Sequence, residues 1–185
     1  MEEQVFDIVG HFNHSIKLLN NQVERLKIAQ LNLIAGQKAK MATAYGAAIN
    51  YLTVGRECLT HWESEYDLTL NLFTEATEAT YLNGDFKQME QLAQIVLQQA
   101  RTLSDEVKVC EIQIRAYAAQ NQQHHAIKTA LMFLKRLGIS LAEDATQEEV
   151  EFAIHKMQVS LSGKPIQSLI DLPMMTDTSM KMVNG

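Results

Sequence analysis

The stretch LNLIAGQKAKMATAYGAAINYL, residues 31–52, joins an apolar segment to an alanine-rich one across Gly36. A glycine followed by Lys38 suggests a phosphate-binding loop, which needs the pattern G-x-x-x-x-G-K-[ST] between a strand and a helix. No glycine precedes Lys38 at the required spacing, Ala39 follows it, and no strand pattern comes before. We therefore predict that Gly36 is a turn between two helices and that Lys38 and Lys40 begin the second helix, facing water.

Apolar residues recur at intervals of three and four along the whole chain, and there is almost no alternating pattern of the strand type. This spacing places one apolar stripe on each helix. The sequence therefore predicts an all-α fold of about eight helices. Examples of such stripes are Val5, Val9, Phe12, Ile16 and Leu19; Phe86, Met89, Ala93, Val96 and Ala100; and Val150, Ile154, Met157 and Leu161.

Capping residues divide these stripes into helices. Ser64 and Ser104 precede acidic residues and are predicted N-caps, because a serine oxygen accepts from free backbone N–H groups. Thr146 and Glu149 have the spacing of a capping box. Gly138 follows a basic turn and is predicted to end a helix.

The turns also repeat. Gly36, Gly84 and Asn121 are residue types that adopt left-handed backbone conformations readily, and they stand 48 and 37 residues apart. These intervals exceed the 34-residue tetratricopeptide period. We predict a tetratricopeptide-like α-solenoid: three degenerate hairpins over residues 21–137, a capping helix at 1–20, capping helices at 138–172, and a flexible tail or linker at 173–185.

Three phrases carry a family resemblance: residues 31–52 quoted above, YDLTLNLFTEATEATYLNGDFKQMEQL (66–92) and IQIRAYAAQNQQHHAIKTAL (112–131). Together they resemble the helical segment of large cyanobacterial multi-sensor signalling kinases. In that family a serine/threonine kinase domain and a signalling ATPase domain precede the segment, and sensory and histidine-kinase modules follow. The resemblance implies that this chain is the middle helical portion of such a kinase. The resemblance assigns no catalytic residue to this chain.

The composition limits which classes of partner are expected. The 16 basic and 22 acidic residues leave a net charge of −6 and no basic stripe, which argues against nucleic acid. Two cysteines in helical segments indicate a reducing cytoplasm. Neither a signal peptide nor an apolar run long enough for membrane insertion is visible.

Few residues in the sequence are candidates for catalysis or metal binding. His11 and His14 share a helix face, but no further ligands stand at motif spacing, and His155 lacks the surroundings of a phosphorylated histidine. We expect no metal, no cofactor and no catalytic residue. Polar residues on first helices line one face of a repeat array, so the predicted partner-contact surface is Tyr66, Thr69, Glu75 and Glu78.

We therefore expect a noncatalytic protein-interaction and signal-relay scaffold, not an enzyme. Its partners would be neighbouring domains of the same parent chain or other signalling proteins, and apolar surface left uncovered could pair two copies as a homodimer. The alternative is a sensor that holds a small molecule or peptide between hairpins; an enclosed pocket with convergent polar groups would distinguish it.

Overall fold

The computed structural model describes residues 6, 9–10, 12–13, 21–59, 61–141 and 145–161. These residues form seven named helices and no strand, which confirms the all-α prediction. The predicted first cap at 1–20 falls largely outside the described residues, and the tail at 173–185 entirely so. The helices are α2 (Gln22–Met41), α3 (Tyr45–Glu57), α4 (Tyr66–Leu82), α5 (Phe86–Gln99), α6 (Leu103–Ala119), α7 (Gln123–Arg136) and α8 (Gln147–Leu161).

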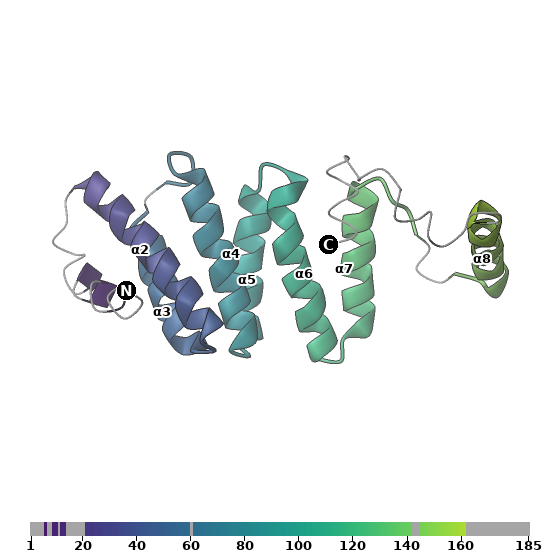
Figure 1. The fold of residues 1–185 in the computed structure, drawn as a ribbon, viewed down its shortest axis with the longest axis horizontal. Helices are drawn as coiled ribbons and strands as arrows, with labels where there is room; N and C mark the ends of the chain where they lie inside the picture. Colours follow the sequence, from purple (N-terminus) through teal and green to yellow (C-terminus); the bar gives the residue numbers. More distant parts are fainter. Residues whose placement is uncertain are drawn as a thin grey trace. The chain divides into compact units, whose positions relative to one another are not determined.

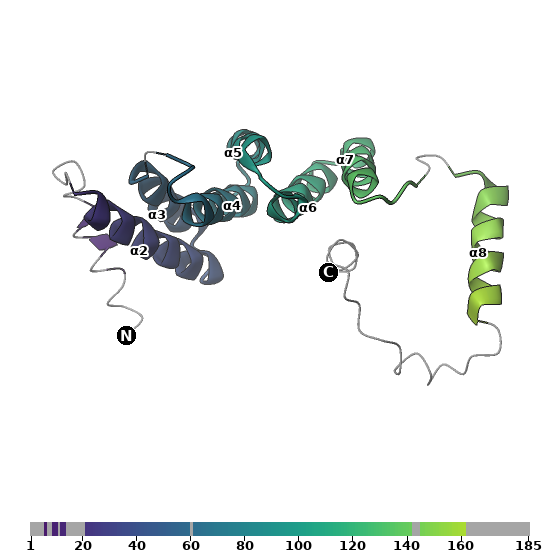
Figure 2. The same ribbon diagram turned by 90° about the horizontal axis from the view of Figure 1, so that it is seen from above.

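The chain divides into two compact units, Met1–Ala126 and Ile127–Gly185. Within the first unit each helix packs on the next, from α2 to α6, and α4 also packs on both α2 and α6. Figure 2 shows the result as two layers, with α2, α4 and α6 along one side and α3 and α5 along the other. Alternate helices therefore share a face.

Three helix-to-helix turns have the same geometry. The backbone is left-handed at Thr43 (φ 59°), Gly84 (φ 79°) and Asn121 (φ 58°). The next residue donates its N–H to the carbonyl five positions back, at 2.8–2.9 Å, and the left-handed residue donates to the carbonyl three positions back. This is the Schellman motif, which satisfies carbonyls that a helix end leaves free. The following helix begins two residues after each left-handed residue.

The prediction for Gly36 is wrong. Gly36 lies buried inside α2, and the turn is formed by Thr43. A Cβ atom built on Gly36 would lie 2.5 Å from Cγ of Leu52 on α3, so this glycine lets the two helices approach closely. The predicted turns at Gly84 and Asn121 are confirmed. With Thr43 in place of Gly36, the first interval shortens from 48 to 41 residues.

The helix caps differ from prediction at two places. Ser64 does not cap α4, whose N-cap is Glu65 and makes no side-chain cap hydrogen bond. Ser104 lies inside α6, which Thr102 caps through a reciprocal capping box with Asp105. The capping box of Thr146 and Glu149 and the helix stop at Gly138 are confirmed.

The core of the first unit has two clusters. One joins α2, α3 and α4 around Leu52 and Leu72, and the other joins α5 and α6 with support from α4 around Met89 and Ile112; these four side chains are at most 1% exposed. Gly55 extends the close packing, because a Cβ there would lie 2.7 Å from Cδ2 of Leu72.

Candidate functional site

Five polar side chains connect the three helices that share one layer. Lys40 on α2 forms ion pairs with Glu75 and Glu78 on α4. Lys108 on α6 pairs with the other carboxylate oxygen of Glu78 at 3.0 Å, and Gln37 donates to Oε1 of Glu75 at 3.2 Å. We call Gln37, Lys40, Glu75, Glu78 and Lys108 the α2–α4–α6 network.

The α2–α4–α6 network lies at the surface but is largely shielded from water. The side chains of Lys40, Glu75 and Glu78 are 15%, 21% and 17% exposed, whereas Lys108 is 46% exposed. The contacts of the network involve two lysines and two glutamates, so its charges balance. Because the side chains are partly buried, water screens these ion pairs less than fully exposed ones. Each charge is therefore stabilised mainly by its partners in the network.

The pKa shifts follow from this arrangement. Burial raises the pKa of Glu78, but the hydrogen bonds and charges of Lys40 and Lys108 outweigh burial and hold that pKa below its ordinary value. Burial lowers the pKa of Lys40, and its bonds to Glu75 and Glu78 outweigh this and raise it. A general acid requires a carboxyl group whose pKa is raised. The pKa of Glu78 is lowered, so this side chain is not suited to that role.

Acid is therefore expected to weaken the fold through Glu78. Because the folded-state pKa of Glu78 is lowered, its contribution is present above the ordinary pKa and is lost as the pH falls through the folded-state value. Urea unfolding followed from neutral pH to below about 4.3 should show a smaller loss of stability in Glu78→Gln than in the unchanged protein. Glu63→Gln, at an exposed residue, is the control. Equal slopes for Glu78→Gln and the unchanged protein would contradict the assignment.

Two of the four predicted contact residues, Glu75 and Glu78, belong to the network. Tyr66 lies near the start of α4, donates its hydroxyl to Asp105 at 2.7 Å, and has the Arg101 guanidinium 3.8 Å above its ring. Thr69 does not belong to any surface: it is 2% exposed and donates to the carbonyl of Glu65. The structure thus corrects the prediction for Thr69.

The lysines of the network were not predicted from the sequence. Lys38 and Lys40 lie in the last turn of α2 instead of beginning a helix, and Lys40 is bound to α4 instead of facing water. A pair of glutamates three residues apart, among Ala76 and Ala79, was the available signal. Small residues bring the helices close, and largely buried carboxylates then need cations from neighbouring helices.

Other candidate chemistry is not gathered into a site in the described residues. No group of three His, Cys, Asp or Glu side chains there is placed to hold a metal ion. His11 and His14 lie outside the described residues. Cys58 and Cys110 are buried thiols. None of the described helices combines the length and apolarity that a membrane span requires.

Comparison with known proteins gives one relative. The chain is 25% identical over 178 residues to Hybrid signal transduction histidine kinase G of Dictyostelium discoideum. The match covers 90% of this chain and 5% of that protein, so the chain spans a small part of its relative. This similarity associates the chain with a signal-transduction histidine kinase. No family model and no solved structure matches.

Proposed function

We propose that this chain is a noncatalytic, tetratricopeptide-like interaction and relay segment of a large cytoplasmic signalling kinase. The observation that carries the proposal is the packing of alternate helices: α4 packs on both α2 and α6, and the α2–α4–α6 network joins all three. Stacked hairpins share their core with neighbours and present one continuous face to partners. The similarity to a histidine kinase supplies the signalling context.

The relay would operate through the same face. A shift of one hairpin relative to the next changes the distances between α2, α4 and α6, so it must loosen the ion pairs of Lys40 or Lys108. A partner that supplies carboxylates or cations to these side chains would favour one arrangement over the other. Coupling requires such a difference in binding between two states.

A binding experiment with a charge reversal tests the proposal. The 185-residue segment, immobilised, should capture a neighbouring domain of its natural parent chain. Lys108→Glu, on the α6 part of the network, should weaken capture several-fold, because Lys108 is 46% exposed and a partner docked on this face would contact it directly. Lys87→Glu is the matched control, since Lys87 is exposed on α5 in the other layer.

The outcomes separate the alternatives. Equal weakening by both reversals would contradict a docking role for this face. Failure to capture any neighbouring domain, together with a small molecule or peptide that copurifies from lysate, would favour a sensor domain instead.

A further inference from the structure

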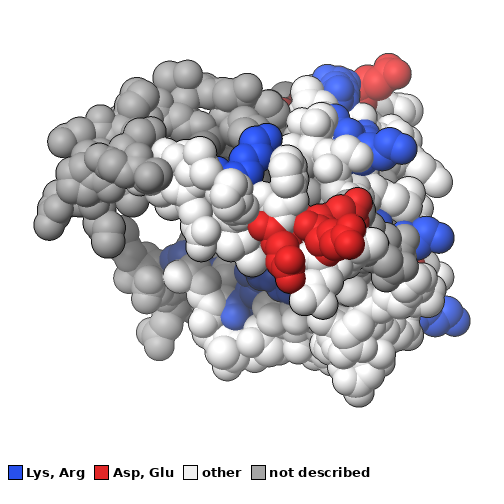
Figure 3. Space-filling view, turned by 90° about the vertical axis from the view of Figure 1, so that its right-hand side faces the viewer, with Lys and Arg blue, Asp and Glu red and all other residues white. Residues whose placement is uncertain are grey.

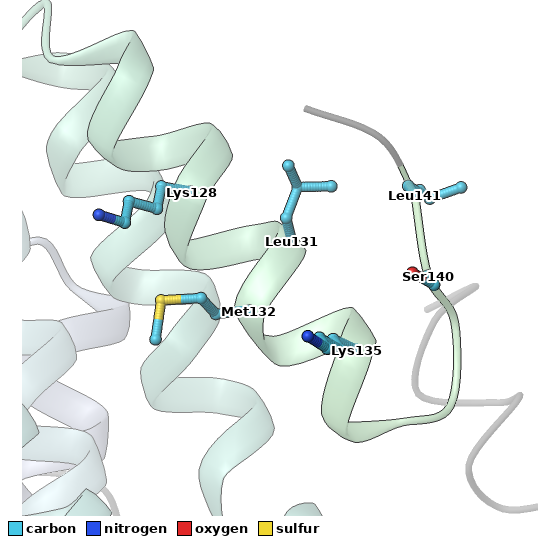
Figure 4. A pocket seen from close by; sticks show the side chains of 6 residues that line it. All are labelled: Lys128, Leu131, Met132, Lys135, Ser140 and Leu141. Carbon is cyan, nitrogen blue, oxygen red and sulfur yellow. The ribbon is translucent and has the colours of Figure 1, made fainter. Parts of the chain in front are cut away.

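Among the described residues of the second unit, two helices expose apolar faces. On α7, Lys128, Leu131, Met132 and Lys135 follow one another at the spacing of a single helix face, and with Ser140 and Leu141 they line a hollow of about 270 Å³. Figure 4 shows this hollow between α7 and the segment that follows it. Met132 is 62% exposed and Leu141 59% exposed.

The apolar face of α8 is equally uncovered. No residue of α8 is buried, and its stripe of Val150, Ile154, Met157 and Leu161 is 43–54% exposed. Residues at this spacing form one side of a helix. Phe152 lies on the opposite side and is 70% exposed. A helix with such a stripe gains most of its stability by packing it against another element.

Charge distinguishes the two helices. In α7 the charged residues are Lys128, Lys135 and Arg136, all basic, and two of them lie in its last turn. In α8 the first turn carries Glu148 and Glu149, followed by Glu151, against a single Lys156. Figure 3 shows acidic side chains gathered in one place on the face that it draws. The basic end of α7 therefore suits the acidic start of α8.

Chain connectivity allows these complementary ends to lie together. The end of α7 is joined to the start of α8 by ten residues, 137–146, which reach up to about 33 Å. The connection from α3 to α4, residues 58–65, is shorter, yet α4 packs on α3. An antiparallel return also sets opposite ends of the two helix dipoles side by side, which is favourable.

We propose that α8 folds back antiparallel along α7, with its Val150–Leu161 stripe over Leu131 and Met132 and with Glu151, at the edge of that stripe, beside Lys135. In this arrangement α8 takes the place that α4 has on α3 and α6 has on α5, and it covers the hollow beside α7. The proposal does not depend on the signalling role.

Cross-linking in the full chain tests this docking. Met132→Cys combined with Val150→Cys places two thiols on the facing sides, whereas Met132→Cys combined with Phe152→Cys places the second thiol on the far side of α8. A short bis-maleimide should cross-link the first pair within one chain several-fold faster than the second. The native Cys58 and Cys110 are buried and react slowly, and each single cysteine variant gives the background.

Charge reversal gives a second readout. Lys135→Glu should slow the cross-link of the Val150 pair, and adding Glu151→Lys should restore its rate. Equal rates for the Val150 and Phe152 pairs would overturn the proposal. Cross-links formed only between chains would overturn it as well, because they would show that a second copy covers α8.

Discussion

Replacing Gly36 by valine is expected to lower the free energy of unfolding by about 2–3 kcal/mol. The Cβ atom would lie 2.5 Å from Cγ and 2.7 Å from Cδ2 of Leu52. Leu52 is completely buried, so its side chain has no open space to enter. The helices α2 and α3 must then separate. Urea unfolding followed by the fluorescence of Trp62, the single tryptophan, measures the loss; Trp62 packs against Phe73 in the same unit.

Gly46→Val is the matched control for Gly36→Val. Gly46 lies in α3, and a Cβ there would meet nothing within 4 Å, so the change should alter stability by no more than about 0.5 kcal/mol. Leu52→Ala alone should cost about 2–5 kcal/mol. In the double variant Gly36→Val/Leu52→Ala, the total loss should be smaller than the sum, because alanine vacates the space that valine needs. Additive losses would show that Leu52 is not the obstacle.

The two roles of glycine explain what sequence reasoning could and could not foresee about the fold. Helical periodicity is a local property, so the all-α class was predictable from spacing alone. Gly84 and Asn121 were recognisable because their residue types tolerate positive φ. Gly36 instead permits a close approach to Leu52, which lies on a different helix, and the left-handed residue at that turn is Thr43. Threonine carries no signal for such a turn.

Prediction from the sequence had the same limit at the candidate site. Glu75 and Glu78 were visible as a pair, but Lys40 stands 35 residues before Glu75 in the chain, and only tertiary packing brings the two together. Polarity also failed to predict exposure at Thr69, because its hydroxyl bonds to a carbonyl of its own helix and can therefore be buried at little cost. Predicting the contact residues of a repeat face therefore requires the register between helices, and the spacing of residues within one helix does not give it.

A second large effect is expected at Lys40. Lys40→Met keeps the aliphatic length of the side chain but removes the cation shared by Glu75 and Glu78. Both carboxylates are about four-fifths buried and lie three residues apart on α4, so they would repel each other without a neutralising charge. We expect the free energy of unfolding at neutral pH to fall by about 2–3 kcal/mol, somewhat less than for a fully buried pair.

Lys38→Met is the matched control for Lys40→Met, because Lys38 lies in the same last turn of α2 and has no ion pair within the described part of the chain. It should cost less than about 0.5 kcal/mol. Adding Glu75→Gln to Lys40→Met should recover part of the loss, since Glu78 retains Lys108 at 3.0 Å and one repelling charge is gone. Recovery would show that the loss arises from the unpaired carboxylates and not from the packing of the methionine. Equal losses for Lys40→Met and Lys38→Met would mean that the network does not hold α2 to α4, and the proposed relay through this face would then lose its physical basis.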